Sequence, residues 1–251
     1  MRILPNTHDH MVLPFGTWTL ADVGTHRDET THYDDINEKT YSYIRRFVDG
    51  QKMTHIKDGA HVLDICCRTG NAIAYFSKFH KITAVGADVS DYLLKLAVER
   101  LQMDKLTNYK LVKFQSLPLP FADGEFDNVL FFETMEHMPD PPAFIAELFR
   151  VLKPNGEMLL TTPNHFWEFF HWFAAVTHIH HGEGPHHFIP RKQIMKIVTD
   201  AGFTITDEKT TVLLPIGPRW FTRLGEILEE WGRGWYTEWF GLRRMFICTK
   251  P

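Results

Sequence analysis

The sequence predicts an α/β fold with one mostly parallel, seven-stranded sheet and helices on both of its faces. Between residues 61 and 162, short apolar runs typical of strands alternate with stretches of helical periodicity. This βαβ alternation is typical of a parallel sheet that helices cover on both sides. Two further strand-like runs near the C-terminus have one short helix between them. They are therefore expected to close the sheet with an antiparallel edge.

Composition narrows the class of protein. The chain has 251 residues, of which 44% are hydrophobic, so it can bury a core without disulfide bonds. A net charge of -4 gives no electrostatic reason to expect a nucleic-acid partner. Three cysteines fit a reducing cytoplasm better than a disulfide framework. No apolar run has the length of a signal peptide or of a transmembrane segment.

The elements are expected in a regular order within a single domain, residues 1–251. The predicted strands are His61–Ile65, Ile82–Ala87, Tyr109–Phe114, Phe126–Phe132, Glu157–Thr162, Phe203–Leu214 and Leu242–Thr249. The predicted helices are Tyr33–Val48, which Gly50 ends, Ala72–Lys78, Ser90–Met103, Pro141–Leu152, Pro190–Ala201 and Arg219–Trp231. Residues 1–50 form an irregular arm and a lid helix in this prediction, and residues 164–190 form a small aromatic cap inserted after the fifth strand.

Two acids stand at the ends of the first two strands. Asp64 lies near the end of the first strand and is followed by a tight turn that contains Gly70. An acid at this place favours a ligand with a cationic or hydroxyl part. Asp88 comes 24 residues later, where a carboxylate can accept both hydroxyl groups of a ribose. Ligands of parallel sheets bind at the carboxyl ends of the strands.

The turn after the first strand resembles the first motif of the class I S-adenosylmethionine-dependent methyltransferases, acid-x-Gly-x-Gly-x-Gly. Cys66 and Arg68 replace two of the three glycines, and Gly70 remains. Residues 117–127, 147–157 and 162–164 resemble later stretches of the same family, in the same order and at the same spacing. The joint resemblance covers roughly residues 60 to 165. It implies a Rossmann-like fold and a methyltransferase, whereas the Gly-x-Gly-x-x-Gly of nicotinamide dehydrogenases is absent.

The resemblance implies where S-adenosylmethionine would bind. Its methionine part would lie at the turn, its ribose at Asp88, and its adenine between Val89 and the edge formed by Gln115 and Ser116. The implied cofactor-binding residues are Asp64, Cys66, Arg68, Gly70, Asp88, Val89, Gln115, Ser116 and Glu133. The adjacent Cys66 and Cys67 are interpreted as small hydrophobic residues in preference to a redox or metal site.

The stretch Glu133–His137 follows the fourth strand and has three possible interpretations. His137 can serve as the base that removes a proton from a hydroxyl nucleophile. Alternatively, Glu133, Glu136 and His137 can hold a divalent cation, since the stretch is similar to one in the ubiquinone-pathway O-methyltransferases, where such residues are associated with a metal. The third interpretation is that these residues only stabilise the end of the strand. Of the two functional interpretations, a catalytic base at His137 is favoured over a metal site.

Seven histidines lie between residues 165 and 187, interspersed with aromatic residues. They are interpreted as the lining of a substrate cap, with His186, His187 and Trp167 as substrate residues. A metal site is the alternative, although closed-site ligand spacing is lacking. Ordinary core packing would account for some of the aromatic residues.

Together these features predict S-adenosylmethionine-dependent O-methylation of a small molecule, which could be an aromatic compound, a quinone precursor, a lipid or a sugar. The alternative is a binding or scaffold protein that kept the fold and lost the cofactor, which the degenerate Cys66 and Arg68 turn would suit. The sequence contains no signal for a particular oligomeric state.

Overall fold

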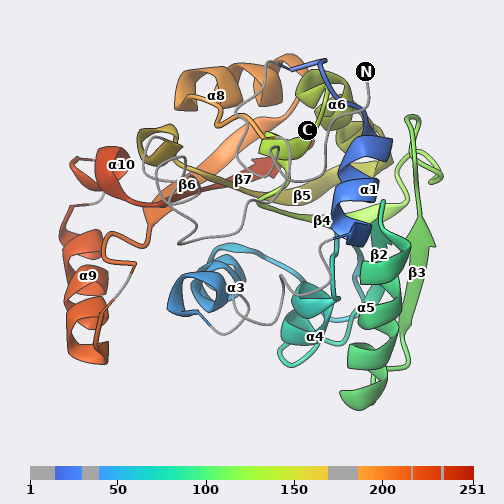
Figure 1. Cartoon of the computed structure of the whole chain (residues 1–251), viewed down its shortest axis with the longest axis horizontal. Helices are drawn as coiled ribbons and strands as arrows, with labels where there is room; N and C mark the ends of the chain where they lie inside the picture. Colours follow the sequence, from blue (N-terminus) through green and yellow to red (C-terminus); the bar gives the residue numbers. More distant parts are fainter. Residues whose placement is uncertain (1–14, 30–39, 169–185, 216, 233–234) are drawn as a thin grey trace.

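The computed structural model describes residues 15–29, 40–168, 186–215, 217–232 and 235–251, arranged around one seven-stranded sheet (Figure 1). The strand order is β3-β2-β1-β4-β5-β7-β6. The strands are β1 (His61–Ile65), β2 (Thr83–Asp88), β3 (Tyr109–Lys113), β4 (Phe126–Phe132), β5 (Leu152–Pro163), β6 (Thr204–Thr211) and β7 (Arg243–Thr249). Strands β1 to β5 pair in parallel, while β7 runs antiparallel to both β5 and β6. The predicted fold class is confirmed, and its antiparallel edge is the β6–β7 pair.

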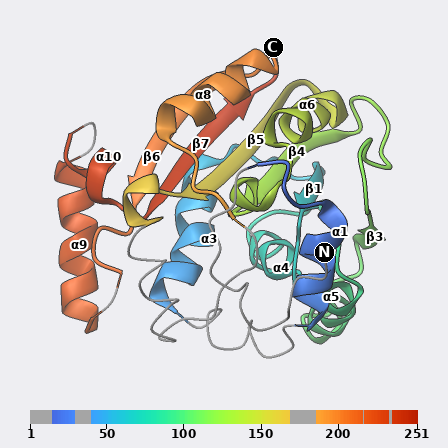
Figure 2. The ribbon, with the colours of Figure 1, turned by 45° about the horizontal axis from the view of Figure 1, so that its top comes forward.

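Helices cover both faces of the sheet (Figures 1 and 2). The α-helices are α1 (Leu20–Glu29), α3 (Tyr41–Met53), α4 (Asn71–Phe76), α5 (Asp91–Met103), α6 (Pro141–Val151), α8 (Arg191–Asp200), α9 (Arg219–Trp231) and α10 (Thr237–Phe240). Two 3-10 helices, η1 (Met135–His137) and η2 (His165–Trp167), follow β4 and β5. In the described chain, no helix is both long and apolar enough to cross a bilayer.

The core consists of two clusters separated by the sheet. Successive residues of a strand point to opposite faces, so Val62 of β1 packs in one cluster and Leu63 in the other. The Val62 cluster contains residues of α3, α4 and α5, including Phe47, Phe76 and Leu101. The Leu63 cluster contains residues of α1, α6 and α8. Both faces are therefore apolar, as the near-continuous hydrophobic strands predict.

The N-terminal part differs from its prediction. Residues 20–29, expected to be irregular, form α1. Its first turn is fixed by Thr19 and Asp22, since the Thr19 backbone N–H donates to the Asp22 carboxylate and the Asp22 backbone N–H donates to the Thr19 hydroxyl. This reciprocal pair is a capping box. Residues 33–39 of the predicted lid helix lie outside the described residues.

The end of α3 and the start of β5 also differ from their predictions. Helix α3 continues through Gly50 to Met53. Gly50 instead allows α3 to pack closely on β5, since a Cβ there would stand 2.7 Å from the Leu159 side chain. Strand β5 begins at Leu152, ahead of the predicted Glu157, and the intervening stretch is a bulge. Asn155 accommodates that bulge in the left-handed region at φ 60°.

Candidate functional site

The turn after β1 has a positive φ at each of the three positions where the resembled motif has glycine, although only one glycine is present. Cys66, Arg68 and Gly70 all lie in the left-handed region, at φ 56°, 51° and 73°. A Cβ on Gly70 would also stand 3.3 Å from both Ala97 and Leu101. The two replacements therefore preserve the shape of the motif at the cost of backbone strain of about 1 kcal/mol each.

Asp64 is a buried acid beside this turn. Its side chain is almost fully enclosed, and Oδ2 has no hydrogen-bond partner among the described residues. Burial raises the pKa of Asp64 well above its usual range, and the nearby Asp88 carboxylate adds to this shift. An enclosed acid with a free oxygen is suited to a ligand that brings a positive charge or a donor, which fits the methionine part of S-adenosylmethionine.

Asp88 is held at the end of β2 by the backbone around it. Its Oδ2 accepts from the Arg68 N–H at 2.9 Å, and its Oδ1 accepts from the Ser90 N–H at 3.0 Å. The hydrogen bond from Arg68 joins Asp88, the acid predicted to bind a ribose, to the turn after β1. This hydrogen bond brings the turn after β1 and the end of β2 into direct contact.

Helix α1 covers Asp88, and the sequence alone did not predict this contact. Arg27 Nη1 lies 3.5 Å from Asp88 Oδ2, and the Asp88 side chain is completely enclosed. The approach is close, because a Cβ on Gly24 would lie 3.1 Å from the Val89 carbonyl oxygen. Val89, the predicted neighbour of adenine, is buried in the same cluster as Trp18 and Val23. Binding of a ribose at Asp88 requires Arg27 to give way.

The remaining residues of the predicted adenine edge lie beyond β3. Gln115 and Ser116 are exposed and follow Phe114, whose N–H donates to the Asp88 carbonyl at 3.1 Å. Gln115 and Ser116 therefore follow directly after a residue that is hydrogen-bonded to Asp88. An exposed amide at this edge can still pair with an adenine amino group.

Both cysteines of the pair are buried. Burial raises the pKa of Cys66 to about 12, although the neighbouring Arg27 acts in the opposite direction. Burial also raises the pKa of Cys67, and Asp64 and Asp88 add to it. A thiolate is the form that attacks disulfides and binds metals. The geometry therefore favours the interpretation of both residues as small hydrophobic side chains.

Glu133 is the centre of an ion-pair cluster. It directly follows β4, with its backbone in the left-handed region at φ 42°. Its carboxylate pairs with Arg46 of α3 at 2.9 Å and with Arg243 of β7. Two arginines thus occupy the carboxylate that the metal interpretation would need. Among the described residues, no group of three or more His, Cys, Asp or Glu side chains could hold a metal ion.

His137 lies with two histidines of the predicted cap. It ends η1 and is buried, and its ring centre is 6.1 Å from that of His186. The backbone N–H of His187 donates to the Glu136 carbonyl at 2.9 Å. His187 Nδ1 is buried and has no hydrogen-bond partner in the described chain. The structure therefore gathers three predicted site histidines at the carboxyl end of β4.

The N-terminal segment completes this site, which the sequence did not indicate. The Trp18 indole N–H donates to the His137 carbonyl at 2.8 Å, and the Phe15 ring lies 4.7 Å from that of His187. Glu136 accepts from the Thr162 hydroxyl of β5 at 3.1 Å. These contacts join the segment around His137 and the ring of His187 to the N-terminal segment, and Glu136 to β5.

Trp167 of η2 bonds to the C-terminal part of the chain. Its indole N–H donates to the Phe240 carbonyl at 2.9 Å, which joins η2 to α10. The structure thus places this predicted substrate residue against the C-terminal part of the chain. Most of the predicted cap, residues 169–185, lies outside the described residues.

Comparison with known proteins identifies the family. A family model described as a methyltransferase domain matches residues 36–208. A demethylmenaquinone methyltransferase from Staphylococcus carnosus is 32% identical over 133 residues, which are 51% of this chain and 54% of that protein. The chain spans about half the length of the curated relatives it matches.

Solved structures share the fold at low identity. The (4+2)-cyclase SpnF has a TM-score of 0.69 at 17% identity, covering 96% of this chain and 98% of that one. A phosphoethanolamine N-methyltransferase from Haemonchus contortus, in complex with S-adenosylmethionine, has a TM-score of 0.66 at 17% identity, covering 91% of this chain and 60% of that one. From its motifs, its strand order and the family match, the chain belongs to the methyltransferase-domain family of S-adenosylmethionine-dependent enzymes.

Proposed function

We propose that this protein transfers a methyl group from S-adenosylmethionine to a hydroxyl oxygen of a small aromatic or quinone-type molecule, with His137 as the base. The observation that carries the proposal is the gathering of His137, His186 and His187 at the carboxyl end of β4. Strands β1 and β4 are neighbours, so these histidines belong to the same sheet edge as Asp64.

The reaction needs little from the protein beyond placement and one proton transfer. Bound S-adenosylmethionine supplies a methyl group on a positively charged sulfur, which leaves as a neutral thioether. Asp64 and Asp88 would hold the cofactor, and the turn between Cys66 and Gly70 would shape its site. His137 would accept the proton of the attacking hydroxyl, and His187 Nδ1 would orient the acceptor. Correct placement of the two reactants supplies most of the acceleration.

The proposed acceptor class rests on the lining and on the relatives. Phe15 and Trp18 lie beside the histidines and can contact an aromatic ring. The curated relatives are named demethylmenaquinone methyltransferases, which favours a quinone-type acceptor over a sugar.

The test measures transfer of a labelled methyl group from S-adenosylmethionine to a dihydroxynaphthalene acceptor, followed by location of the label on oxygen or carbon. His137→Ala is expected to lower turnover about 10²- to 10⁴-fold while cofactor binding is retained. His55→Ala is the matched control, because the His55 side chain is 81% exposed and precedes β1. Label on ring carbon, or full turnover by folded His137→Ala, would contradict the proposal.

A second candidate is a protein that kept the fold but does not use the cofactor. Arg27 beside Asp88 and the strained Cys66 and Arg68 turn favour it, and fold alone does not determine activity. Equilibrium dialysis with labelled S-adenosylmethionine separates the two candidates. Saturable binding that Asp88→Asn weakens supports the methyltransferase, and absence of binding supports the second candidate.

A further inference from the structure

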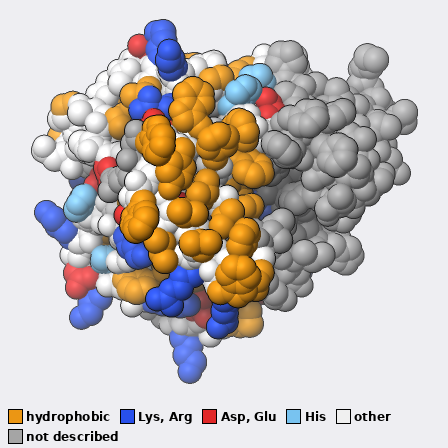
Figure 3. All heavy atoms as spheres, turned by 90° about the vertical axis from the view of Figure 1, so that its left-hand side faces the viewer, with side chains coloured by type: hydrophobic (Ala, Val, Ile, Leu, Met, Phe, Trp, Pro, Cys, Tyr) orange, Lys and Arg blue, Asp and Glu red, His pale blue; other side chains and the backbone are white. Residues whose placement is uncertain are grey.

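Helix α9 presents an apolar stripe away from the body of the protein. Trp220, Leu224, Ile227 and Trp231 follow one another at spacings of four, three and four residues, so they lie on one side of the helix. Their exposed fractions are 70%, 42%, 48% and 82%. The exposed apolar surface continues over α10 and the loop before it, through Trp235, Trp239 and Phe240. These seven side chains form the surface that we call the α9–α10 face, and Figure 3, which views the molecule from the side of α9 and α10, shows a broad hydrophobic area there.

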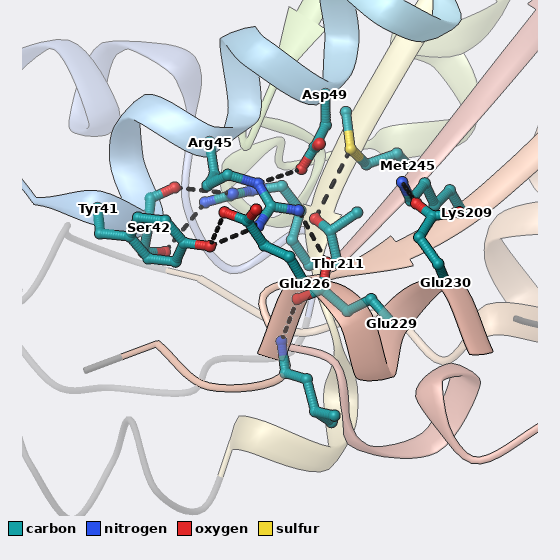
Figure 4. Close-up of polar contacts among 12 residues, drawn as sticks. Tyr41, Ser42, Arg45, Asp49, Lys209, Thr211, Glu226, Glu229, Glu230 and Met245 are labelled. Atoms are coloured by element: carbon teal, nitrogen blue, oxygen red, sulfur yellow. Dashed lines mark hydrogen bonds and ion pairs between the residues drawn. The ribbon is translucent and has the colours of Figure 1, made fainter. Parts of the chain in front are cut away.

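The opposite side of α9 is fixed to the protein. Its buried residues are Thr222, Gly225 and Glu229. The Glu229 carboxylate pairs with Arg45 of α3 at 2.8 Å and accepts from the Leu213 N–H at 2.9 Å (Figure 4). A Cβ on Gly225 would lie 3.0 Å from Leu214. The helix therefore cannot rotate to bury its apolar stripe without breaking a buried ion pair.

The charges beside the stripe favour an anionic partner. Glu226 pairs with Arg45 at 3.2 Å, and Glu230 pairs with Lys209 at 2.7 Å, so the carboxylates of α9 are all engaged by cations of the protein. Arg219 and Arg223 are exposed on the flank of the stripe, and neither has an ion-pair partner among the described residues. The charges that α9 itself leaves to meet a partner are therefore positive.

The composition of the face distinguishes a lipid surface from a second protein copy. Four exposed tryptophans dominate it, and tryptophan is the side chain that concentrates at the boundary between lipid headgroups and acyl chains. An amphipathic helix with aromatic residues on one side and basic residues beside them lies in the plane of that boundary. A two-fold dimer through this face would pair it with an identical surface, in which the carboxylates of α9 are already engaged by cations.

We propose that the α9–α10 face docks the protein on the surface of a bilayer that contains anionic lipid, with the tryptophans in the headgroup–acyl boundary. The face is continuous with the end of β5, since the Phe166 and Phe240 rings are 5.3 Å apart and Asn164 donates to the Gly241 carbonyl at 2.9 Å. Docking would bring the carboxyl edge of the sheet near the membrane. The docking itself does not depend on the proposed methyl transfer.

The experiment measures co-sedimentation of the whole chain, without cofactor, with vesicles of phosphatidylcholine or of phosphatidylcholine and phosphatidylglycerol. The unmodified protein is expected to bind both, and the mixed vesicles more tightly. Trp220→Ser with Trp231→Ser is expected to weaken binding to mixed vesicles at least about tenfold. Both indoles are mostly exposed, so the fold should be retained, which circular dichroism checks. Met103→Ser is the matched control, because Met103 is 75% exposed at the end of α5 and should leave binding unchanged.

Substitutions of Arg219 and Arg223 test the electrostatic part of the proposal independently of the tryptophans. Arg219→Gln with Arg223→Gln should remove the preference for phosphatidylglycerol while binding to phosphatidylcholine is kept, because each basic residue near an anionic surface adds about fivefold to affinity. Sedimentation velocity is run in parallel on the unmodified protein and on the tryptophan variant.

Three outcomes would overturn the proposal. The first is failure of the unmodified protein to bind either vesicle. The second is binding that the tryptophan variant retains in full, which would locate the contact elsewhere. The third is a dimer that the tryptophan substitutions convert to a monomer, since the face would then be covered by a second copy.

Discussion

At the scale of single residues, Asp88 is the side chain on which the cofactor prediction depends most. Asp88→Asn is expected to weaken S-adenosylmethionine binding about 10- to 100-fold, because it removes a charge-assisted hydrogen bond worth about 1.5–3 kcal/mol. Calorimetry on the folded variant measures the change. Asp91→Asn, three residues later and exposed, is the control. Equal affinity in Asp88→Asn and the unmodified protein would show that ribose does not bind at β2.

Substitutions of Cys66 test whether the non-glycine residues of the turn are under backbone strain. Cys66→Gly relieves a positive φ but removes a buried thiol, so stability is expected to change by less than about 1 kcal/mol, with cofactor affinity kept or raised. Cys66→Val is expected to destabilise by more than that, because β-branched residues fit positive φ poorly. Urea unfolding compares the two variants. A stable Cys66→Val protein would be inconsistent with the strained turn.

At the scale of elements, Arg45 joins α3 to α9. Its guanidinium contacts Asp49 of its own helix and Glu229 of α9, both at 2.8 Å (Figure 4). Burial by itself lowers the pKa of Arg45. The carboxylates of Asp49 and Glu229 together raise it by more than burial lowers it, so the pKa lies above its usual range. Because two largely enclosed carboxylates depend on one cation, the position of α9 depends on this residue.

Arg45→Met is expected to lower the free energy of unfolding by about 3–5 kcal/mol, since it leaves buried carboxylates without a counterion. Adding Glu229→Gln should restore part of the loss. Lys196→Met breaks an exposed pair with Asp200 in α8 and should cost less than about 1 kcal/mol. Denaturant titration of the three variants measures these values. Similar losses for Arg45→Met and Lys196→Met would mean that the buried cluster does not hold α9.

At the scale of the whole molecule, Asp64 links stability to pH. Its pKa in the folded protein is above the unfolded value of about 3.9, so the folded state binds the proton more tightly. The resulting stabilisation is fully present below the unfolded pKa and is lost as pH rises through the folded pKa.

Asp64→Asn should therefore gain stability relative to the unmodified protein as pH rises from acidic to neutral. Unfolding free energies at a series of pH values for both proteins measure this difference, and Asp104→Asn, an exposed site at the end of α5, serves as control. A difference between Asp64→Asn and the unmodified protein that is constant with pH would show that folding does not shift the pKa of Asp64.

Local signals in the sequence were sufficient for the sheet, the order of its elements and the acids at its strand ends. Strand β1, for example, has the predicted bounds, and Ser90 caps α5 as its residue type predicts, accepting from the Leu93 N–H. Helix α1 also has a local signal, Thr19 and Asp22 at capping-box spacing, within a stretch whose polar composition otherwise predicts an irregular arm. Within an element, such signals act over three or four residues, and a sequence displays them directly.

Only the tertiary structure decided which distant charges meet. Arg27 is 61 residues from Asp88, and Arg243 is 110 residues from Glu133, so no spacing rule connects either pair. The same holds for the outward direction of the α9 stripe. Its sequence is amphipathic, and an amphipathic helix usually turns its apolar side inward. Here the buried pair of Glu229 with Arg45 fixes the polar side inward, and the tryptophans are left to the surface.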